Sequence, residues 1–219
     1  MDFTIQPAGK KHLNYADEIS SMMQLAARQR GTGIANRSAE YIQSKMTEGK
    51  AVIALHKGRL AGFCYIESWS HHKYVANSGL IVHSDYRKTG LARRIKRKIF
   101  DLSREKYPDA KIFGITTSLP VMKINSDLGY KPVTFSELTT DEEFWKGCQS
   151  CKNYDILTRT SRNHCLCTGM LFDPEKEVSK SKNGNKYDRW QRFVRFLRWH
   201  RIRAYRKTRK FKNLTKEPA

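Results

Sequence analysis

The stretch VHSDYRKTGLARRIKRK, residues 82–98, decides between two kinds of protein. Half of the residues from Asp85 to Lys98 are Lys or Arg, which favours a surface for nucleic acid. The same stretch places Gly90 where a strand-like run, residues 78–84, gives way to a helix-like one, and this favours a pocket for a phosphate. The first interpretation predicts a binding module, and the second predicts an enzyme.

The turn at Gly90 has the features of an anion site. The first amides of a helix have no partner inside the helix and lie at the positive end of its dipole. Gly90 allows a positive φ or a close approach of the backbone to a ligand, Ala92 is small, and Arg87 and Lys88 add charge. The pattern is neither G-x-G-x-x-G nor a P-loop. It therefore predicts a strand-turn-helix site for a pyrophosphate.

The helix that follows is amphipathic. Leu91, Ile95, Ile99 and Leu102 fall on one stripe of residues 90–107. Most of the basic residues in 93–98 are therefore expected to face solvent.

The rest of the chain predicts an α+β fold, a mixed sheet with helices packed on it, over residues 1–174. The interpretation divides the chain into that domain, which includes a Cys-rich segment at 148–167, and a basic tail at 175–219. The expected strands are 3–8, 51–70 (a hairpin turning at Lys57-Gly58), 74–84, 110–118, 131–138 and 153–160, and the expected helices are 13–30, 38–46, 90–107 and 118–129.

Two motifs carry a resemblance to the GNAT acetyltransferases. Residues 82–92 resemble that family's acetyl-CoA loop, V-x-P-x-[YF]-[RQ]-x-x-G-x-[GA], with Ser84 in place of the proline. INSDLGYKPV, residues 124–133, resembles the family's next element, in which a helix ends in L-G-[FY] and a strand follows. The resemblance covers residues 3–174 and implies a mostly antiparallel, twisted mixed sheet with helices on both faces. The positions of the loop motif that match are Val82, Tyr86, Arg87, Gly90 and Ala92.

The resemblance implies transfer of an acyl group from acetyl-CoA, or another acyl-CoA, to an amine. Backbone amides at Ile81 and Val82 would hold the pantetheine and polarise the thioester carbonyl, because fixed donors stabilise a developing oxyanion. The pyrophosphate would lie on the amides of Arg87, Lys88, Thr89, Gly90, Leu91 and Ala92.

The expected catalytic residues are Glu67, Asn125 and Tyr130. Many members of the family place a tyrosine, as acid for the leaving thiolate, where this chain has Asn125, which can hydrogen-bond the CoA sulfur or pantetheine but cannot act as an acid. Tyr130 is close to Asn125 in the sequence and is a candidate for the acid, although a buried core aromatic also suits this position. Glu67 is the first choice as base, with His71 and His72 in the following turn as weaker choices.

For the acceptor, Arg28, Arg30 and Arg37 bracket a loop with two glycines in the region where the family receives its acceptor. Arginine forks match carboxylates, which indicates an amino acid or another carboxylate-bearing amine; the alternative is a loop with surface arginines. A weaker similarity to N-acylglutamate-synthase-like enzymes makes glutamate, and so arginine biosynthesis, the natural guess.

Five cysteines without an export signal indicate a reducing, cytoplasmic location. Cys64 stands alone and suits the core. The other four, in two pairs, predict a structural zinc site across a hairpin, the alternative being reduced cysteines packed at the end of the sheet. This set is Cys148, Cys151, Cys165 and Cys167.

The net charge is +21, of which residues 180–219 carry +13 from fifteen Lys or Arg against Asp188 and Glu217. The tail is expected to be helical and to pack on its own protein, on a second subunit of a homodimer, on RNA or on an anionic surface. No apolar run is long enough to span a bilayer. Two other functions stay open: a protein or ribosome-associated acetyltransferase, and a basic nucleic-acid-binding protein without catalysis.

Overall fold

The computed structural model describes residues 1–30, 37–149 and 151–176. The first compact unit runs from Met1 to Pro174 and contains a seven-stranded sheet among its described residues. The strands are β1 (Thr4–Pro7), β2 (Ala51–His56), β3 (Arg59–Trp69), β4 (Tyr74–Val82), β5 (Lys111–Thr116), β6 (Lys131–Val133) and β7 (Thr168–Phe172).

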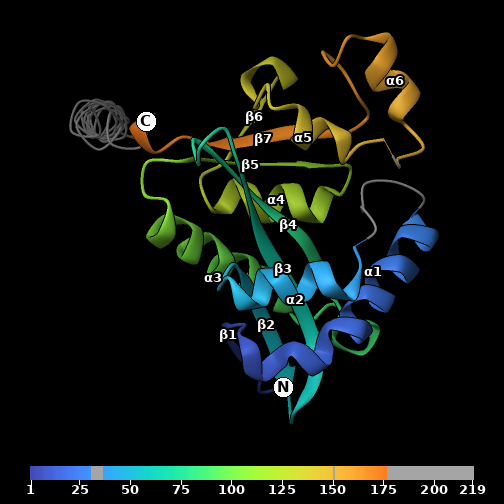
Figure 1. Ribbon diagram of the computed structural model, residues 1–219, viewed down its shortest axis with the longest axis vertical. Helices are drawn as coiled ribbons and strands as arrows, with labels where there is room; N and C mark the ends of the chain where they lie inside the picture. Colours follow the sequence, from blue (N-terminus) through green and yellow to red (C-terminus); the bar gives the residue numbers. More distant parts are fainter. Residues whose placement is uncertain (31–36, 150, 177–219) are drawn as a thin grey trace, which may run out of the picture. The chain divides into compact units, whose positions relative to one another are not determined.

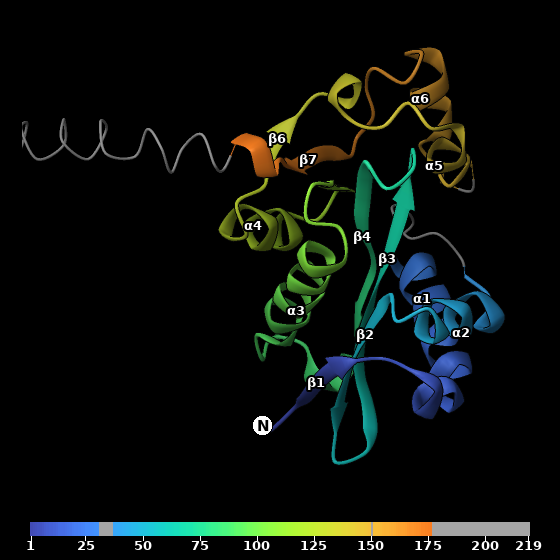
Figure 2. The same ribbon diagram turned by 60° about the vertical axis from the view of Figure 1, so that its left-hand side comes forward.

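Helices cover both faces of the sheet, as the sequence predicts. Figure 2 shows α1 and α2 on one side of the strands, and α3 and α4 on the other. The α-helices are α1 (Ala16–Arg30), α2 (Ala39–Thr47), α3 (Leu91–Lys106), α4 (Leu119–Asp127), α5 (Glu142–Lys146) and α6 (Tyr154–Arg159). Three 3-10 helices accompany them: η1 (Lys10–Tyr15), η2 (Ser84–Tyr86) and η3 (Phe135–Glu137).

The strand order is β1-β2-β3-β4-β5-β7-β6, and every neighbouring pair is antiparallel except β4 with β5 (Figure 1). This confirms the predicted mixed, mostly antiparallel α+β fold. The parallel pairing is short, since it joins Tyr74–Ala76 to Lys111–Phe113 and goes no further. Beyond Ala76, β4 continues along β3, while β5 continues along β7. The sheet therefore opens between β4 and β5.

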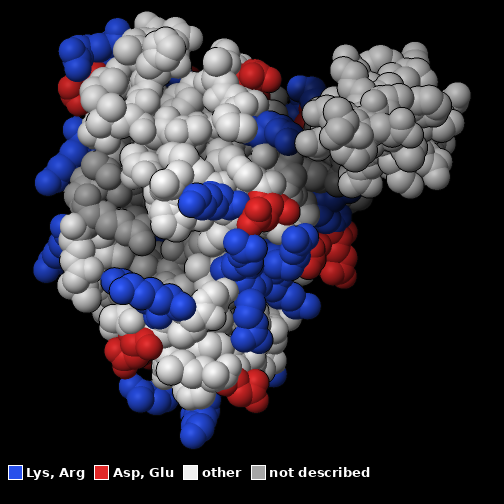
Figure 3. Space-filling view, turned by 180° about the vertical axis from the view of Figure 1, so that it is seen from behind, with Lys and Arg blue, Asp and Glu red and all other residues white. Residues whose placement is uncertain are grey.

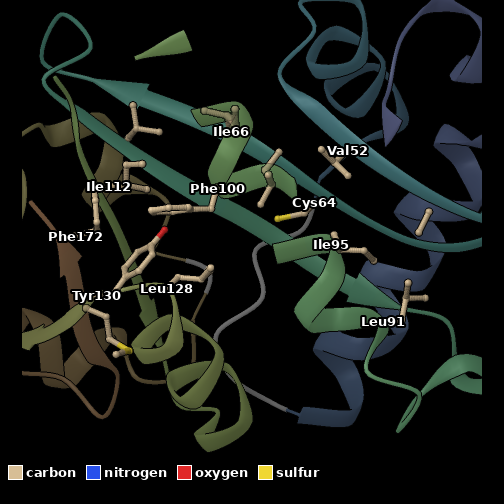
Figure 4. Close-up of a cluster of buried hydrophobic side chains, with 14 of the residues drawn as sticks. Val52, Cys64, Ile66, Leu91, Ile95, Phe100, Ile112, Leu128, Tyr130 and Phe172 are labelled. Carbon is tan, nitrogen blue, oxygen red and sulfur yellow. The ribbon is translucent and has the colours of Figure 1, made fainter. Parts of the chain in front are cut away.

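The side chains of β3 alternate between two cores. Phe63 and Tyr65 pack with α1 and α2, whereas Cys64 and Ile66 pack with α3. Because side chains of a strand point to opposite faces in turn, one strand serves both layers. Figure 4 shows the α3 side of this arrangement, where Leu91, Ile95 and Phe100 of α3 face the strands.

The buried face of α3 is wider than the predicted stripe. Leu91, Ile95 and Ile99 are buried as expected, but Phe100, Ser103 and Lys96 are buried as well. The expectation that the basic residues in 93–98 mostly face solvent holds for Arg93, Arg94, Arg97 and Lys98 and is wrong for Lys96. The four exposed side chains line one shallow groove with Asp101, and Figure 3 shows basic side chains gathered on one face of the molecule.

Most of the expected elements are present, and the errors are near the C-terminal end of the domain. Ser38 caps α2 through a hydrogen bond from the Tyr41 amide, as expected. Residues 153–160, expected as a strand, contain α6, and the strand β7 was not expected. The predicted basic tail lies, from residue 177 onward, outside the described residues. No helix in the described part of the chain is long and apolar enough to cross a membrane.

Candidate active site

A cavity of about 610 Å³ occupies the opening between β4 and β5. Its walls include Tyr65, which packs with α1 and α2, and Lys96, which projects from α3 on the other face. The cavity therefore reaches both faces of the sheet. A ligand held in it can meet a second reactant arriving from the opposite side.

A bulge shapes the β4 wall of this cavity. Phe63 pairs with Ile81 and Tyr65 pairs with Ser78, so β4 has one residue more than β3 in this interval. Gly79 takes a φ of +63° there, and a Cβ at this position would lie 2.2 Å from Cε1 of Tyr65. Only glycine fits both the backbone and the space. Residues 77–81 line the cavity, whereas Val82 is half-buried and lies outside its lining.

The predicted pyrophosphate loop lies at the start of α3. Gly90 caps the helix with a φ of +80°, and nothing lies within 4 Å of where its Cβ would be. Lys88 also takes a positive φ, of 63°, and Thr89 Oγ1 donates a hydrogen bond of 2.7 Å to the Tyr86 carbonyl. No described residue accepts a hydrogen bond from the backbone amides of residues 88–92. These amides and the open space above Gly90 suit an anion.

Glu67 lies on the α1 and α2 side of the cavity, where Tyr41 and Arg37 contact it. The Tyr41 hydroxyl donates to Glu67 Oε1, and Arg37 Nη2 lies 3.3 Å from the same oxygen. Arg37 Nε donates a 3.0 Å hydrogen bond to the hydroxyl of Tyr65. The sequence indicates Glu67 as a base and Arg37 as an acceptor-binding residue, without relating the two. The structure places them in contact.

The two tyrosines beside Glu67 are held as neutral phenols. Burial, and next the charge of Glu67, raise the pKa of Tyr41 and of Tyr65. At neutral pH both hydroxyls therefore keep their protons and do not compete with Glu67 as bases. Neither tyrosine was singled out from the sequence, and their helical and strand positions resemble those of ordinary core aromatics.

Asn125 and Tyr130, the two residues expected near the leaving CoA thiolate, differ in their surroundings. Asn125 is 2% exposed and lines the cavity, and its Oδ1 has no hydrogen-bond partner among the described residues. Tyr130 is 1% exposed and is absent from the cavity lining, and its hydroxyl donates a 3.0 Å hydrogen bond to Oδ1 of Asn77. Burial raises the pKa of Tyr130 well above its usual value. Figure 4 shows this ring inside the core beside Leu128 and Phe100.

The other predicted acceptor and base residues are not gathered at the cavity. Arg28 is exposed on α1 and absent from the lining, and the side chain of Arg30 and the loop at 31–36 lie outside the described residues. His71 and His72 form an exposed turn away from the lining, where His72 Nδ1 lies 3.0 Å from the Ser68 hydroxyl.

The four cysteines of the two pairs line the far end of the cavity, near α5 and α6, and all are free thiols. Burial raises the pKa of Cys148 to about 11 and that of Cys167 to about 12. Among the described residues, no three His, Cys, Asp or Glu side chains are arranged to hold a metal ion. The sequence predicted a hairpin between the two pairs, and α6 occupies that segment instead.

Residues 19–119, which include the Gly90 loop, match the family model described as the acetyltransferase (GNAT) family. A search of curated proteins finds no match.

Solved structures with the same fold include N-acetylglutamate synthase from Neisseria gonorrhoeae, complexed with coenzyme A and N-acetyl-glutamate. It has a TM-score of 0.56 and 16% identity, over 79% of this chain and 35% of that one, so the chain spans about a third of that synthase. The putative acetyltransferase yncA from Salmonella typhimurium, with acetyl-CoA, has a TM-score of 0.55 and 13% identity over 80% and 95% of the two chains. A GNAT-family acetyltransferase from Staphylococcus aureus Mu50 has a TM-score of 0.55 and 11% identity, over 79% of this chain and 99% of that one.

The fold, the loop before α3 and the family model agree. Residues 19–119 thus match the GNAT family model, and the solved structures with the same fold include GNAT acetyltransferases, as the resemblance implied.

Proposed function

We propose that this enzyme transfers an acetyl group from acetyl-CoA to the amine of a small, carboxylate-bearing acceptor such as an amino acid. The observation that carries the proposal is the cavity through the sheet. It brings the β4 bulge and Asn125 together with the Arg37 and Glu67 pair. Two of the structural neighbours contain coenzyme A or acetyl-CoA, which supports an acyl-CoA as the donor here.

The donor would enter from the start of α3. Amides of residues 88–92 would bind the pyrophosphate, and the pantetheine would run along β4 where that strand has no β5 partner. The thioester carbonyl would then lie against the bulge at residues 78–81, whose backbone supplies fixed donors. Ile81 lines this part of the cavity.

The acceptor would enter from the side of α1 and α2. Glu67 would take the proton of the attacking ammonium, directly or through water. Arg37 would bind the carboxylate of the acceptor while it keeps its contact with Glu67, since a guanidinium binds several oxygens at once. Tyr41 and Tyr65 would fix the positions of these two charged groups.

An assay of CoA release tests the acceptor class. The full chain is incubated with acetyl-CoA and, in turn, glutamate, other amino acids, and peptides with a free N-terminal amine. The proposal predicts that free amino acids are acylated and that decarboxylated analogues of the same amines are poor acceptors. Preference for peptides over amino acids would contradict the acceptor class while leaving the donor assignment intact.

A further inference from the structure

Lys96 is a buried ammonium for which the described residues supply no carboxylate. It is 2% exposed and takes part in none of the ion pairs of the described chain. Its Nζ donates a hydrogen bond of 3.4 Å to the Asn77 carbonyl and lies 5.3 Å from the centre of the Tyr130 ring. Burying an unpaired charge is costly, so a folded protein that keeps one has a use for it.

The position of Lys96 indicates what that use is. It lines the cavity together with Asn77, Ser78 and Asn125, at the place where β4 separates from β5. Asn125 contributes a second unsatisfied group, since its buried Oδ1 finds no hydrogen-bond partner in the part of the chain that the structure describes. A cation and an unsatisfied amide oxygen that line the same cavity point to a ligand that carries negative charge and a hydrogen-bond donor.

We propose that Lys96 is the catalytic acid that protonates the departing CoA thiolate. The inference rests on the proposed function, because it requires the thioester to lie in the opening between β4 and β5. It assigns the acid that Asn125 cannot be, since an amide has no proton to give at neutral pH. Asn125 would accept a hydrogen bond from the pantetheine amide and so hold the sulfur beside Lys96.

The step balances. The acceptor nitrogen bonds to the thioester carbon, and its proton passes toward Glu67. When the tetrahedral intermediate collapses, the C–S bond breaks and its electron pair stays on sulfur. Lys96 gives one proton to that sulfur, which yields CoA with a free thiol and a neutral lysine. The lysine regains a proton from solvent once CoA has left.

The surroundings of Lys96 suit this transfer. Burial lowers the pKa of Lys96 to about 8, and the neighbouring Cys64 opposes this shift. A general acid works best when its pKa lies near the operating pH, and a lysine with this pKa is closer to that condition than an ordinary lysine. The other titratable group facing the ammonium is Tyr130, which stays neutral because burial raises its pKa.

The first test is an ultraviolet titration of the thiol of CoA bound to the full chain, with the desulfo-CoA complex subtracted to remove the protein cysteines. A nearby cation favours the thiolate, so the bound thiol should ionise at lower pH than free CoA. Lys96→Met should raise this apparent pKa by about one unit or more. Lys98→Met, the same change at an exposed position of the same helix, should leave it unchanged.

The second test is the pH profile of kcat. Lys96→Met should lower kcat by about 10²- to 10⁴-fold and change KM for acetyl-CoA little, because general acids contribute on that scale. The wild-type profile should fall as pH rises through the pKa of Lys96, and the variant should lack this limb. Lys96→Arg should retain the lowered thiol pKa while losing kcat, since arginine keeps its proton.

The outcomes separate the inference from the function on which it rests. Failure of the wild-type chain to bind CoA overturns both. Binding with an unshifted thiol pKa in the wild type, a result that needs no variant, overturns the role of Lys96 alone. The role of Lys96 is also overturned if the kcat of Lys96→Met still falls as pH rises in the same range. An acetyl group found on Lys96 during turnover would overturn it too, because Lys96 would then be a nucleophile.

Discussion

Glu67 is held in place by the Tyr41 hydroxyl and the Arg37 guanidinium, and this sets its predicted behaviour. Glu67→Gln keeps the size of the side chain and removes the basic oxygen. We expect kcat to fall by about 100-fold or more while KM for acetyl-CoA changes little, because a base acts on the attacking amine and not on the donor. Steady-state kinetics checks this, with Glu18→Gln, an exposed carboxylate of α1, as the control. Equal kcat in the two variants would remove Glu67 as the base.

Gly90 and Gly58 form a matched pair of residues. They have φ of +80° and +76°, and in both cases nothing lies within 4 Å of an added Cβ. Gly90→Val and Gly58→Val should therefore cost similar backbone strain, on the order of 1–3 kcal/mol. Only Gly90→Val should weaken acetyl-CoA binding, by about tenfold or more, because only that Cβ enters the pyrophosphate site. Thermal unfolding and titration calorimetry together measure the two effects. Equal CoA affinity in both variants would contradict the placement of the loop.

Lys96 also gives the folded state a pH dependence. Its pKa is about 8 in the folded chain against an ordinary value of 10.5, so between these values the unfolded chain holds a proton that the native state lacks. Stability contributed by this group therefore rises with pH across that window, by up to about 1.4 kcal/mol for each pH unit. The difference in unfolding free energy between wild type and Lys96→Met should rise accordingly from pH 8 upward. A difference that stays flat would show that the ammonium is not buried in solution.

Among single residues, the sequence predicts those whose role depends on backbone conformation. Gly90 was identified because a positive φ and a helix start leave a recognisable pattern. Lys96 was missed because a lysine on a basic helix is ordinarily solvated. A signal was present: Ala92, Lys96, Phe100 and Ser103 form a second column beside the apolar stripe, and three of them are small or apolar. Within that column Lys96 lines the sheet opening, which no helical pattern reports.

Among the elements, β4 carries the feature on which the site depends. Gly79→Ala places a methyl group against Tyr65 at a positive φ, whereas Gly58→Ala meets the same kind of φ in open space. Gly79→Ala should therefore destabilise the protein by about 1–3 kcal/mol more than Gly58→Ala, the usual cost of overpacking. Chemical denaturation of the two variants gives this difference. Equal losses would mean that the bulge can shift without cost.

The elements predicted correctly have strong periodic patterns and clear caps. Ser38 starts α2, Lys57-Gly58 turns the hairpin, and Ser118 with Pro120 starts α4, all as the residues indicate. Residues 153–160 were predicted wrongly because the β-branched Ile156 and Thr158 favour a strand, while tertiary packing of Leu157 holds a helix there. The two cysteine pairs are therefore separated by a helix and not by the expected hairpin, and the zinc site stays a prediction.

For the whole molecule, the division of charge predicts separable roles. The three hydrophobic clusters of the described residues lie before Pro174, whereas residues 180–219 carry +13. A chain ending after residue 179 should therefore keep acetyl-CoA binding and acyl transfer to amino acids. Affinity for RNA, with its steep dependence on salt, should fall in the same chain. Loss of acyl transfer on truncation would place the tail within the catalytic unit.

The central claim is that an acyl-CoA binds the opening between β4 and β5 at the start of α3. Thermal unfolding of the full chain with and without acetyl-CoA tests it most directly, because a ligand bound only by the native state must stabilise that state. At a concentration near 100 times the dissociation constant, we expect about 2.7 kcal/mol of added stability, and a smaller gain for Gly90→Val at the same concentration. No stabilisation by acetyl-CoA, succinyl-CoA or CoA would contradict the account.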